Sequence, residues 1–257
     1  MTTTAHSTTS TATSSTPRPP APGAQERGAT RFEAPGTPAA PTRHPGGALI
    51  AGTGLLGGGA ALGAVITTAG PTRTGELHLD QVIAADRVAP LTSLAHLIDI
   101  GLGPHLAPVL LVVLCAAIAL KNRWAAATLG LITITGWLSV AIGKVLYARP
   151  RPPAQLVHAL VHETKPDSFP SGHTAFAVAL LAGTILALKV AHHSTRWAWA
   201  LGIPAVLVVA ASRLYLGAHY LGDVVGSYLF AGGTVLILGA VLSLARTRVL
   251  ARASTQS

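Results

Sequence analysis

Six apolar stretches of similar length dominate this chain and restrict it to a membrane fold. They lie near residues 47–69, 103–120, 124–146, 171–191, 197–215 and 222–245. A helix needs about 20 apolar residues to cross the hydrocarbon core of a bilayer. Only 11% of the residues are charged, whereas soluble domains carry about 25%. We therefore predict an all-α integral membrane protein in which six transmembrane helices form a bundle.

The rest of the chain divides into two tails and one mixed segment. Residues 1–46 are rich in Ser, Thr, Pro and Ala without apolar periodicity, so we predict a disordered tail rather than a signal peptide. Residues 47–245 form the predicted six-span domain, and residues 246–257 a short basic tail. Residues 75–101 place apolar side chains on one helical face, which predicts partial burial in the membrane interface: Val88, Leu91, Leu94, Leu97 and Ile98.

Small residues indicate where the first span packs. Gly54 and Gly58 have the four-residue spacing that lets two helices approach closely, and Gly59 and Gly63 repeat it. The one cysteine, Cys115, lies inside an apolar stretch and is predicted to be a small core residue. These features describe helix packing and carry no chemistry of their own.

Basic residues outside the apolar stretches are distributed unequally between the two sides of a six-span protein. One side would hold Arg43, Lys121, Arg123, Lys189, Arg196, Arg246, Arg248 and Arg252. The other would hold Arg73, Arg87, Arg149 and Lys165, together with Lys144, Arg151 and Arg213, which are set aside here because they belong to the polar motifs described below. The positive-inside rule therefore predicts a multi-pass cell-membrane protein with both termini in the cytoplasm. The net charge of +9 includes no basic run interleaved with aromatic residues, so we expect no nucleic-acid partner.

The first polar motif follows the third apolar stretch. Lys144 and Arg151 are seven residues apart, which would put both on one face of a continuous helix. Pro150, Pro152 and Pro153 make such a helix unfavourable, so we expect Arg151 on the loop just beyond it. Charges at the end of a long apolar span are costly unless they are used or snorkel to the interface. Taken alone, the motif fits either two phosphate-binding cations or a snorkelling lysine followed by an ordinary loop arginine.

The second motif opens the fourth apolar stretch. The run Pro170-Ser171-Gly172-His173 is typical of a helix entry. Free backbone N–H groups at a helix start bind phosphate oxygens well, and glycine permits close approach. His173 would then lie in the first turn beside a bound phosphate. An ordinary capped helix is the alternative.

The third motif spans the junction of the last two apolar stretches. His219 and Asp223 are four residues apart, so they stack on one face if the helix begins near residue 219. A carboxylate that accepts a hydrogen bond from one imidazole nitrogen fixes the tautomer and leaves the other nitrogen free to attack. Arg213 offers a planar fork suited to phosphate. A purely structural His–Asp pair is the alternative for this motif alone.

All three motifs fall at junctions that face the same side of a six-span protein, away from the predicted cytoplasmic side. Together they resemble the signature of the type-2 phosphatidic acid phosphatase superfamily, which includes lipid phosphatases and prenyl diphosphate phosphatases and is related to vanadium haloperoxidases. The resemblance covers residues 144–223 closely and, through the six-span layout, extends to about 47–245. It places the active site at the extracytoplasmic interface.

The resemblance implies a role for each motif residue. His219 would be the nucleophile that forms a phosphohistidine, oriented by Asp223. His173 would protonate the leaving oxygen and then activate water. The phosphate oxygens would be bound by the remaining motif residues, which are Lys144, Arg151, Ser171, Gly172 and Arg213. Fixed cations are the main device for stabilising charge in phosphoryl transfer.

We expect neither a metal nor a cofactor, because no pair of acidic residues has the spacing of a two-metal phosphatase. His192 and His193 lie in a connection on the face opposite the motifs and are expected to be solvent residues. Loop 152–169 is either uncommitted or covers the site and reads the head group, through His158, His162, Glu163, Lys165 and Asp167.

The expected substrate is a membrane lipid phosphate or polyprenyl diphosphate, hydrolysed without metal. The motifs fit a polyprenyl diphosphate, phosphatidate and phosphatidylglycerophosphate equally, and the pattern favours no oligomeric state. One alternative is a non-catalytic lipid-phosphate binder or transporter, which is disfavoured because both His173 and His219 are present. Another is a vanadate-dependent peroxidase, but those relatives are soluble and this chain has six apolar stretches.

Overall fold

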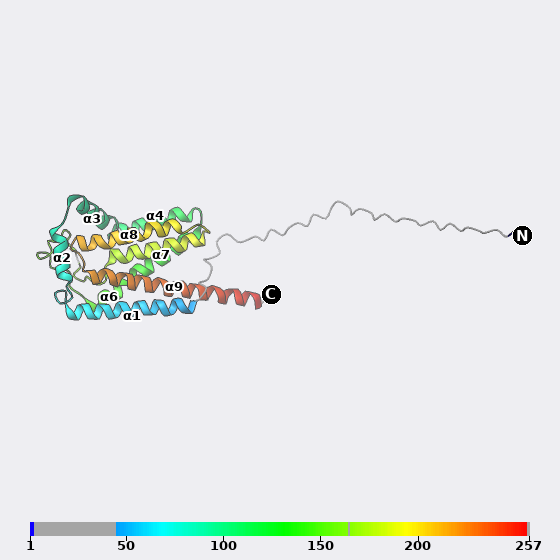
Figure 1. Cartoon of the computed structure of the whole chain (residues 1–257), viewed down its shortest axis with the longest axis horizontal. Coiled ribbons are helices and arrows are strands. Elements are labelled where there is room, and N and C mark those ends of the chain that lie inside the picture. The colour runs from blue at the N-terminus through cyan, green and yellow to red at the C-terminus, as the bar shows by residue number, and fades with distance from the viewer. Residues whose placement is uncertain (3–44, 164, 256–257) are drawn as a thin grey trace. The chain divides into compact units, whose positions relative to one another are not determined.

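The computed structural model describes residues 1–2, 45–163 and 165–255, so nearly all of the predicted tail 1–46 lies outside the described residues. The described part is almost entirely helical (Figure 1). Its helices are α1 (Pro45–Ala69), α2 (Glu76–Ala85), α3 (Ala89–Gly101), α4 (Leu106–Ala119), α5 (Arg123–Leu138), α6 (Val140–Tyr147), α7 (Gly172–Val190), α8 (Arg196–Tyr215) and α9 (Leu221–Thr255).

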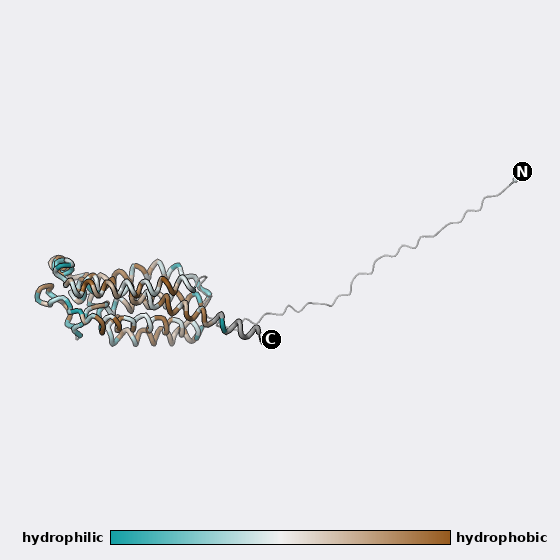
Figure 2. The backbone as a smooth tube through the Cα atoms, turned by 90° about the horizontal axis from the view of Figure 1, so that it is seen from below, coloured by the Kyte–Doolittle hydropathy of each residue, from teal (hydrophilic) through white to brown (hydrophobic). Residues whose placement is uncertain are grey.

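The predicted membrane fold is confirmed in its main features. Among the described residues, five helical segments are long and apolar enough to cross a membrane, namely 45–69, 123–147, 172–190, 196–215 and 221–245. The helices of the bundle are mostly hydrophobic along their length, and hydrophilic stretches gather near the end that carries α2 (Figure 2). A multi-pass helical membrane protein follows from this pattern.

The predicted span 103–120 differs from the structure. Helix α4 has only 14 residues, and it passes the same test only together with α3, to which it is bent by 68°. The sequence between them is Leu102-Gly103-Pro104-His105, which interrupts the helical hydrogen bonds because proline has no N–H and glycine weakens a helix. The described chain therefore has five spans, or six if this bent pair counts as one.

Helix α7 lies at the centre of the bundle. It packs against α5, α8 and α9 and is the most buried of the five spanning segments (Figure 1). Small side chains line its buried faces, including Ala175, Ala179, Gly183 and Ala187. Small residues let neighbouring helices approach closely where no hydrophobic effect drives their association. The first turn of α7 is thereby held in the middle of one end of the bundle.

Helix α1 packs along α9 through glycines, but only some of the predicted ones. A methyl group at Gly59 or Gly63 would meet the rings of Phe230 or Tyr147 within 3.0 Å, as predicted for packing positions. The prediction was wrong for Gly54 and Gly58, where an added methyl group would meet no atom of the described residues within 4 Å. Gly52 takes their place, because a methyl group there would lie 2.8 Å from the carbonyl oxygen of Gly233.

The long loop between α6 and α7 is fixed to the bundle by one arginine. Arg87 donates from Nε to the carbonyl oxygen of Tyr215 at 2.8 Å and from its two terminal nitrogens to those of His158 (2.5 Å) and Val157 (3.2 Å). Further along, the backbone N–H of Ser168 donates to the carbonyl of Arg149 at 2.7 Å. The loop therefore folds back across the end of the bundle.

We predict that Gly52→Ala destabilises the protein by about 1–3 kcal/mol, because the added methyl group must push α1 away from the α9 backbone. Gly54→Ala is the matched control, and it should leave the melting temperature unchanged or slightly higher because its methyl group meets open space. Thermal unfolding in detergent measures both. Equal effects of the two substitutions would contradict the packing described here.

Candidate active site

Five of the eight predicted site residues line one cavity of about 290 Å³ at the end of the bundle, namely Lys144, Arg151, Gly172, His173 and His219. They come from α6, the following loop, the start of α7 and the turn before α9. The rest of the lining comprises the charged residues Glu163 and Lys165 and the apolar residues Leu102, Pro104, Trp137, Leu138, Val140 and Ala141. The cavity thus combines charged and apolar side chains.

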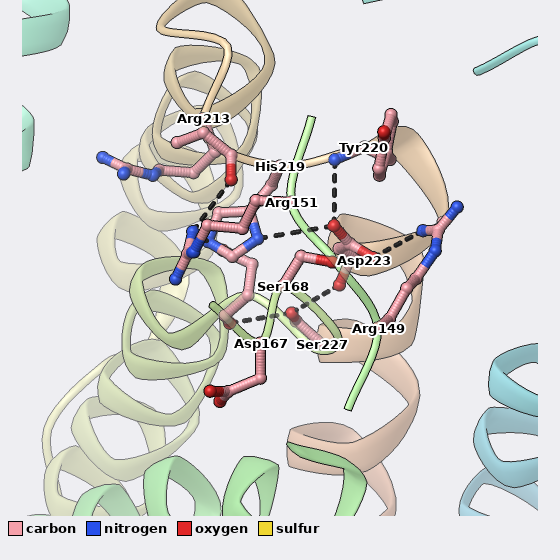
Figure 3. A network of polar contacts seen from close by, with 12 residues as sticks. Arg149, Arg151, Asp167, Ser168, Arg213, His219, Tyr220, Asp223 and Ser227 are labelled. Carbon is pink, nitrogen blue, oxygen red and sulfur yellow. Dashed lines mark hydrogen bonds and ion pairs between the residues drawn. The ribbon is translucent and has the colours of Figure 1, made fainter. Parts of the chain in front are cut away.

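His219 and Asp223 form the buried pair that their spacing predicts. Nδ1 of His219 lies 3.5 Å from Oδ2 of Asp223, and both residues are almost completely buried (Figure 3). The same Oδ2 accepts the backbone N–H of Tyr220 at 2.9 Å. Nε2 of His219 points the other way and lies 3.3 Å from a terminal nitrogen of Arg151. The nitrogen facing the cavity is therefore the one that Asp223 leaves free.

The surroundings of His219 favour its neutral form. Burial lowers its pKa well below the ordinary value, and the positive charges of Arg151, Arg213 and Lys144 lower it further. A neutral imidazole keeps a lone pair on one ring nitrogen, and a nucleophile requires that lone pair. The cations that would bind an anion therefore also keep His219 in its reactive form.

Each predicted phosphate-binding cation is paired with a carboxylate. Lys144 donates to the backbone oxygen of Asp167 at 2.7 Å and lies 3.2 Å from its carboxylate. Arg213, which is fully buried and does not line the cavity, contacts Asp99 at 2.5 Å and Glu163 at 2.9 Å. Arg151 lies 3.5 Å from Glu163. The Glu163 carboxylate thus bridges two guanidinium groups, as a phosphate would.

The start of α7 holds the other predicted residues. Ser171 is fully buried, and its backbone N–H donates to the carbonyl of Asp223 at 3.2 Å. Ser227 Oγ lies 2.8 Å from the carbonyl oxygens of both Ser171 and Asp223, which ties the starts of α7 and α9 together. Nε2 of His173 lies 3.1 Å from the backbone oxygen of Asp99. Both histidines therefore reach one cavity from adjoining helix starts.

Among the described residues, Asp99, Glu163 and His173 form a group whose potential metal-ligating atoms lie within 4.8 Å of one another. Arg213 already binds both carboxylates of this group. A cation there would compete with that guanidinium, so the arrangement favours an anion site. His192 and His193 are exposed between α7 and α8, at the other end of α7 from this group.

Sequence reasoning missed a second layer of charge behind Asp223. Arg149 is 1% exposed and contacts Oδ1 of Asp223 at 2.6 Å and Glu76 at 2.5 Å (Figure 3 shows the contact with Asp223). Asp80, one helical turn after Glu76, is 1% exposed, and neither of its carboxylate oxygens has a hydrogen-bond partner among the described residues. Arg149 lies two residues before Arg151, but no spacing rule marks Glu76 or Asp80.

The fold and the cavity define a multi-pass helical membrane protein that brings two histidines and two of the three predicted cations, Lys144 and Arg151, to one cavity. The family model described as the PAP2 superfamily matches residues 124–248, which include all eight predicted site residues. This match confirms the resemblance predicted from the motifs.

Two curated relatives share part of the sequence. The undecaprenyl-diphosphatase of Sulfolobus acidocaldarius is 36% identical over 90 residues, which cover 34% of this chain and 41% of that protein. Undecaprenyl-diphosphatase BcrC of Bacillus subtilis is 32% identical over 103 residues, which cover 40% of this chain and 50% of the relative. The matched region thus spans half or less of the length of each relative.

A solved structure supports the fold. The transmembrane PAP2 type phosphatidylglycerolphosphate phosphatase from Bacillus subtilis superposes with a TM-score of 0.61 and 22% sequence identity. The superposition covers 74% of this chain and 93% of that chain. At this identity the likeness concerns the arrangement of helices.

Asp80 gives a pH-dependent prediction. Burial raises its pKa from 3.8 to about 7, and the negative charges of Asp223 and Glu76 add to the shift. The folded protein thus holds a proton that the unfolded chain releases, so stability is lost as the pH rises from 3.8 towards about 7 and stays lost above it. Asp80→Asn removes this penalty. Its melting temperature relative to wild type should therefore be higher at about pH 8 than at about pH 5.

The control for this prediction is Asp86→Asn, which changes an exposed carboxylate at the end of the same helix. Its effect on the melting temperature should be small at both pH values. A pH-independent effect of Asp80→Asn would show that this carboxyl does not titrate as described.

Proposed function

We propose that this protein hydrolyses a lipid phosphate or polyprenyl diphosphate through a phosphohistidine on His219, without a metal ion. The observation that carries the proposal is the cavity that is lined both by the two histidines with cations and by apolar side chains. An amphiphilic substrate can place its phosphate against the cations and the start of its hydrocarbon chain against the apolar side chains. The names of the curated relatives support a prenyl diphosphate as the substrate.

The first step follows from the orientation of His219. Nε2 attacks the phosphorus while Asp223 accepts a hydrogen bond from Nδ1 and stabilises the positive charge that develops on the ring. The bond between phosphorus and the leaving oxygen breaks, and His173 donates a proton to that oxygen. Lys144, Arg151 and Arg213 stabilise the charge on the equatorial oxygens, after the phosphate replaces the carboxylates that now pair with them.

The second step reverses these roles. His173, now neutral, accepts a proton from water as the water oxygen attacks the phosphohistidine. The phosphorus–nitrogen bond breaks, inorganic phosphate leaves, and His219 returns to its neutral form. Ser171 and the backbone N–H of Gly172 complete the phosphate cradle at the start of α7.

We also propose that the site faces the extracytoplasmic side and that both termini are cytoplasmic. Lys121 and Arg123 lie at the α4–α5 junction, and Lys189 and Arg196 lie at or near the α7–α8 junction. Both junctions are at the opposite ends of their helices from the site. The positive-inside rule supports this orientation.

A non-catalytic lipid-phosphate binder is the alternative function. It shares the cations of the site but needs neither histidine in a reactive arrangement. The separation of roles between Nδ1 and Nε2 of His219 favours catalysis, because a phosphate-binding histidine has no need of a buried carboxylate behind it.

We predict that His219→Ala reduces phosphate release by at least about a thousandfold, because no other group can form the covalent intermediate. EDTA should leave the wild-type rate unchanged. The assay uses purified protein in detergent with a polyprenyl diphosphate, phosphatidate and phosphatidylglycerophosphate in parallel. His193→Ala, which removes an exposed histidine between α7 and α8, is the matched control and should keep full activity.

The substrate panel separates the outcomes of that assay. A strong preference for the polyprenyl diphosphate supports a role in recycling a carrier lipid, and comparable rates indicate a broad lipid phosphatase. Substantial activity in the His219→Ala protein would exclude the phosphohistidine mechanism. Lipid binding without phosphate release from any substrate would favour the non-catalytic alternative.

The orientation gives a separate prediction in intact cells. With Cys115 replaced by Ala, a cysteine at the exposed position Gln155 should react with a membrane-impermeant maleimide from outside. A cysteine at the exposed position Arg196 should react only after the cells are opened. The reverse pattern would place the site in the cytoplasm.

A further inference from the structure

We propose that Arg149 and Glu76 are positioning residues for the nucleophile: Glu76 holds Arg149, and Arg149 holds Asp223 so that its second oxygen faces His219. This proposal rests on the proposed function, in which His219 is the attacking group. Glu76 lies on α2, outside the residues 124–248 that the family model matches. The segment before the matched region would therefore take part in the chemistry.

The two oxygens of the Asp223 carboxylate have separate partners. Oδ1 accepts from Nη1 of Arg149 at 2.6 Å, whereas Oδ2 faces Nδ1 of His219 at 3.5 Å and accepts the N–H of Tyr220 at 2.9 Å. A carboxylate held at one oxygen cannot rotate without breaking that ion pair. Arg149 therefore fixes the direction in which Oδ2 points (Figure 3).

Arg149 is itself held on its other side. Its second terminal nitrogen donates to Oε2 of Glu76 at 2.5 Å, and its guanidinium carbon lies 4.5 Å from the centre of the Tyr220 ring. The side chain of Arg149 is 2% exposed. Buried guanidinium groups of this kind keep one geometry because each N–H bond has a fixed direction. The arginine is thus clamped between two carboxylates and one ring.

Glu76 connects this clamp back to α9. Its Oε1 accepts the backbone N–H of Gly222 at 2.7 Å, and its Oε2 also accepts from the hydroxyl of Thr74 at 2.7 Å. Gly222 is in the first turn of α9, adjacent to Asp223. Glu76 therefore fixes both the arginine and the backbone that carries the carboxylate. A residue that served only to join α2 to the bundle would not need to contact both Arg149 and the backbone of Gly222.

The charges explain why the arrangement requires both residues. Without Arg149, two buried carboxylates would face each other uncompensated, and Asp223 would gain a proton or turn away. Without the charge of Glu76, Arg149 would lose one of its two ion pairs and its fixed direction. In both cases Oδ2 of Asp223 would no longer be held 3.5 Å from Nδ1 of His219, and its influence on the tautomer of the ring would weaken.

The test compares Glu76→Gln and Arg149→Lys with wild type in the phosphate-release assay. Glu76→Gln keeps the size and an acceptor oxygen for Gly222, and it should lower kcat by about ten- to hundredfold through misplacement of the nucleophile. A lysine at position 149 can hold only one carboxylate at a time, so the kcat of Arg149→Lys should lie between those of wild type and Glu76→Gln. KM should change by less than about threefold, because neither residue lines the cavity.

A matched control and an inhibition constant separate positioning from general stability. Arg73→Met removes an exposed arginine just before α2 and should leave kcat unchanged. The inhibition constant of inorganic phosphate should stay within about threefold of wild type in Glu76→Gln, since Lys144 and Arg151 are intact. The proposal is overturned if the kcat of Glu76→Gln stays within about twofold of wild type. It is also overturned if kcat falls together with the affinity for inorganic phosphate and the melting temperature.

A measurement that needs no turnover tests the same proposal. Nitrogen-15 NMR of histidine-labelled protein, with the His219 signals assigned by their loss in His219→Ala, reports which ring nitrogen carries the proton. Wild type should show a protonated Nδ1, and Glu76→Gln a mixture of tautomers. An unchanged tautomer in both variants would overturn the positioning role. Absence of phosphate release by wild type would instead overturn the proposed function.

Discussion

The buried pair between Arg149 and Asp223 is the interaction on which the rest of the site depends. Both side chains are almost fully removed from water, and a buried charge is tolerated only when it is paired and hydrogen-bonded. This pair fixes the start of α9, and through the carbonyl of Asp223 it also fixes the start of α7. The two histidines sit on those two helix starts or just before them. Their separation is therefore set by a salt bridge that touches no substrate.

The same pairing of buried charges extends through the residues that line the cavity and those behind it. Four cations, Lys144, Arg149, Arg151 and Arg213, face five carboxylates, Glu76, Asp99, Glu163, Asp167 and Asp223. In the proposed function, a phosphate group takes over the cations that now pair with Glu163 and Asp167, both of which lie on the loop between α6 and α7. Arg87 binds the backbone of this loop at Val157 and His158, and Arg151 and Lys144 bind it at Lys165 and Asp167. The loop is therefore attached to the bundle at more than one point.

The sequence predicted five of the six spans and the proximity of His219 to Asp223, because each depends on neighbours close in the chain. Apolar length predicts a span, and a four-residue spacing predicts the contact, although His219 lies in the turn before α9 rather than on the helix itself. The failures depend on tertiary contact. Nothing in the glycine spacing of α1 distinguishes Gly54 from Gly52, since only the position of α9 decides which one is buried. Likewise, Glu76 joins Arg149 across a long stretch of chain, and no local pattern records such a contact.

The location of the site at the end of the bundle follows from the cost of charge in a membrane. Charged groups in the hydrocarbon core are expensive, so a site with four cations is stable only where water and backbone dipoles can reach it. The substrate imposes the opposite requirement, because its hydrocarbon chain stays in the bilayer. The break between α3 and α4 and the end of α5 meet both conditions. They contribute Leu102, Pro104, Trp137 and Leu138 to the cavity that His173 and His219 also line. This lining supports the proposal that a lipid substrate keeps its hydrocarbon chain in the bilayer while its phosphate reaches His219.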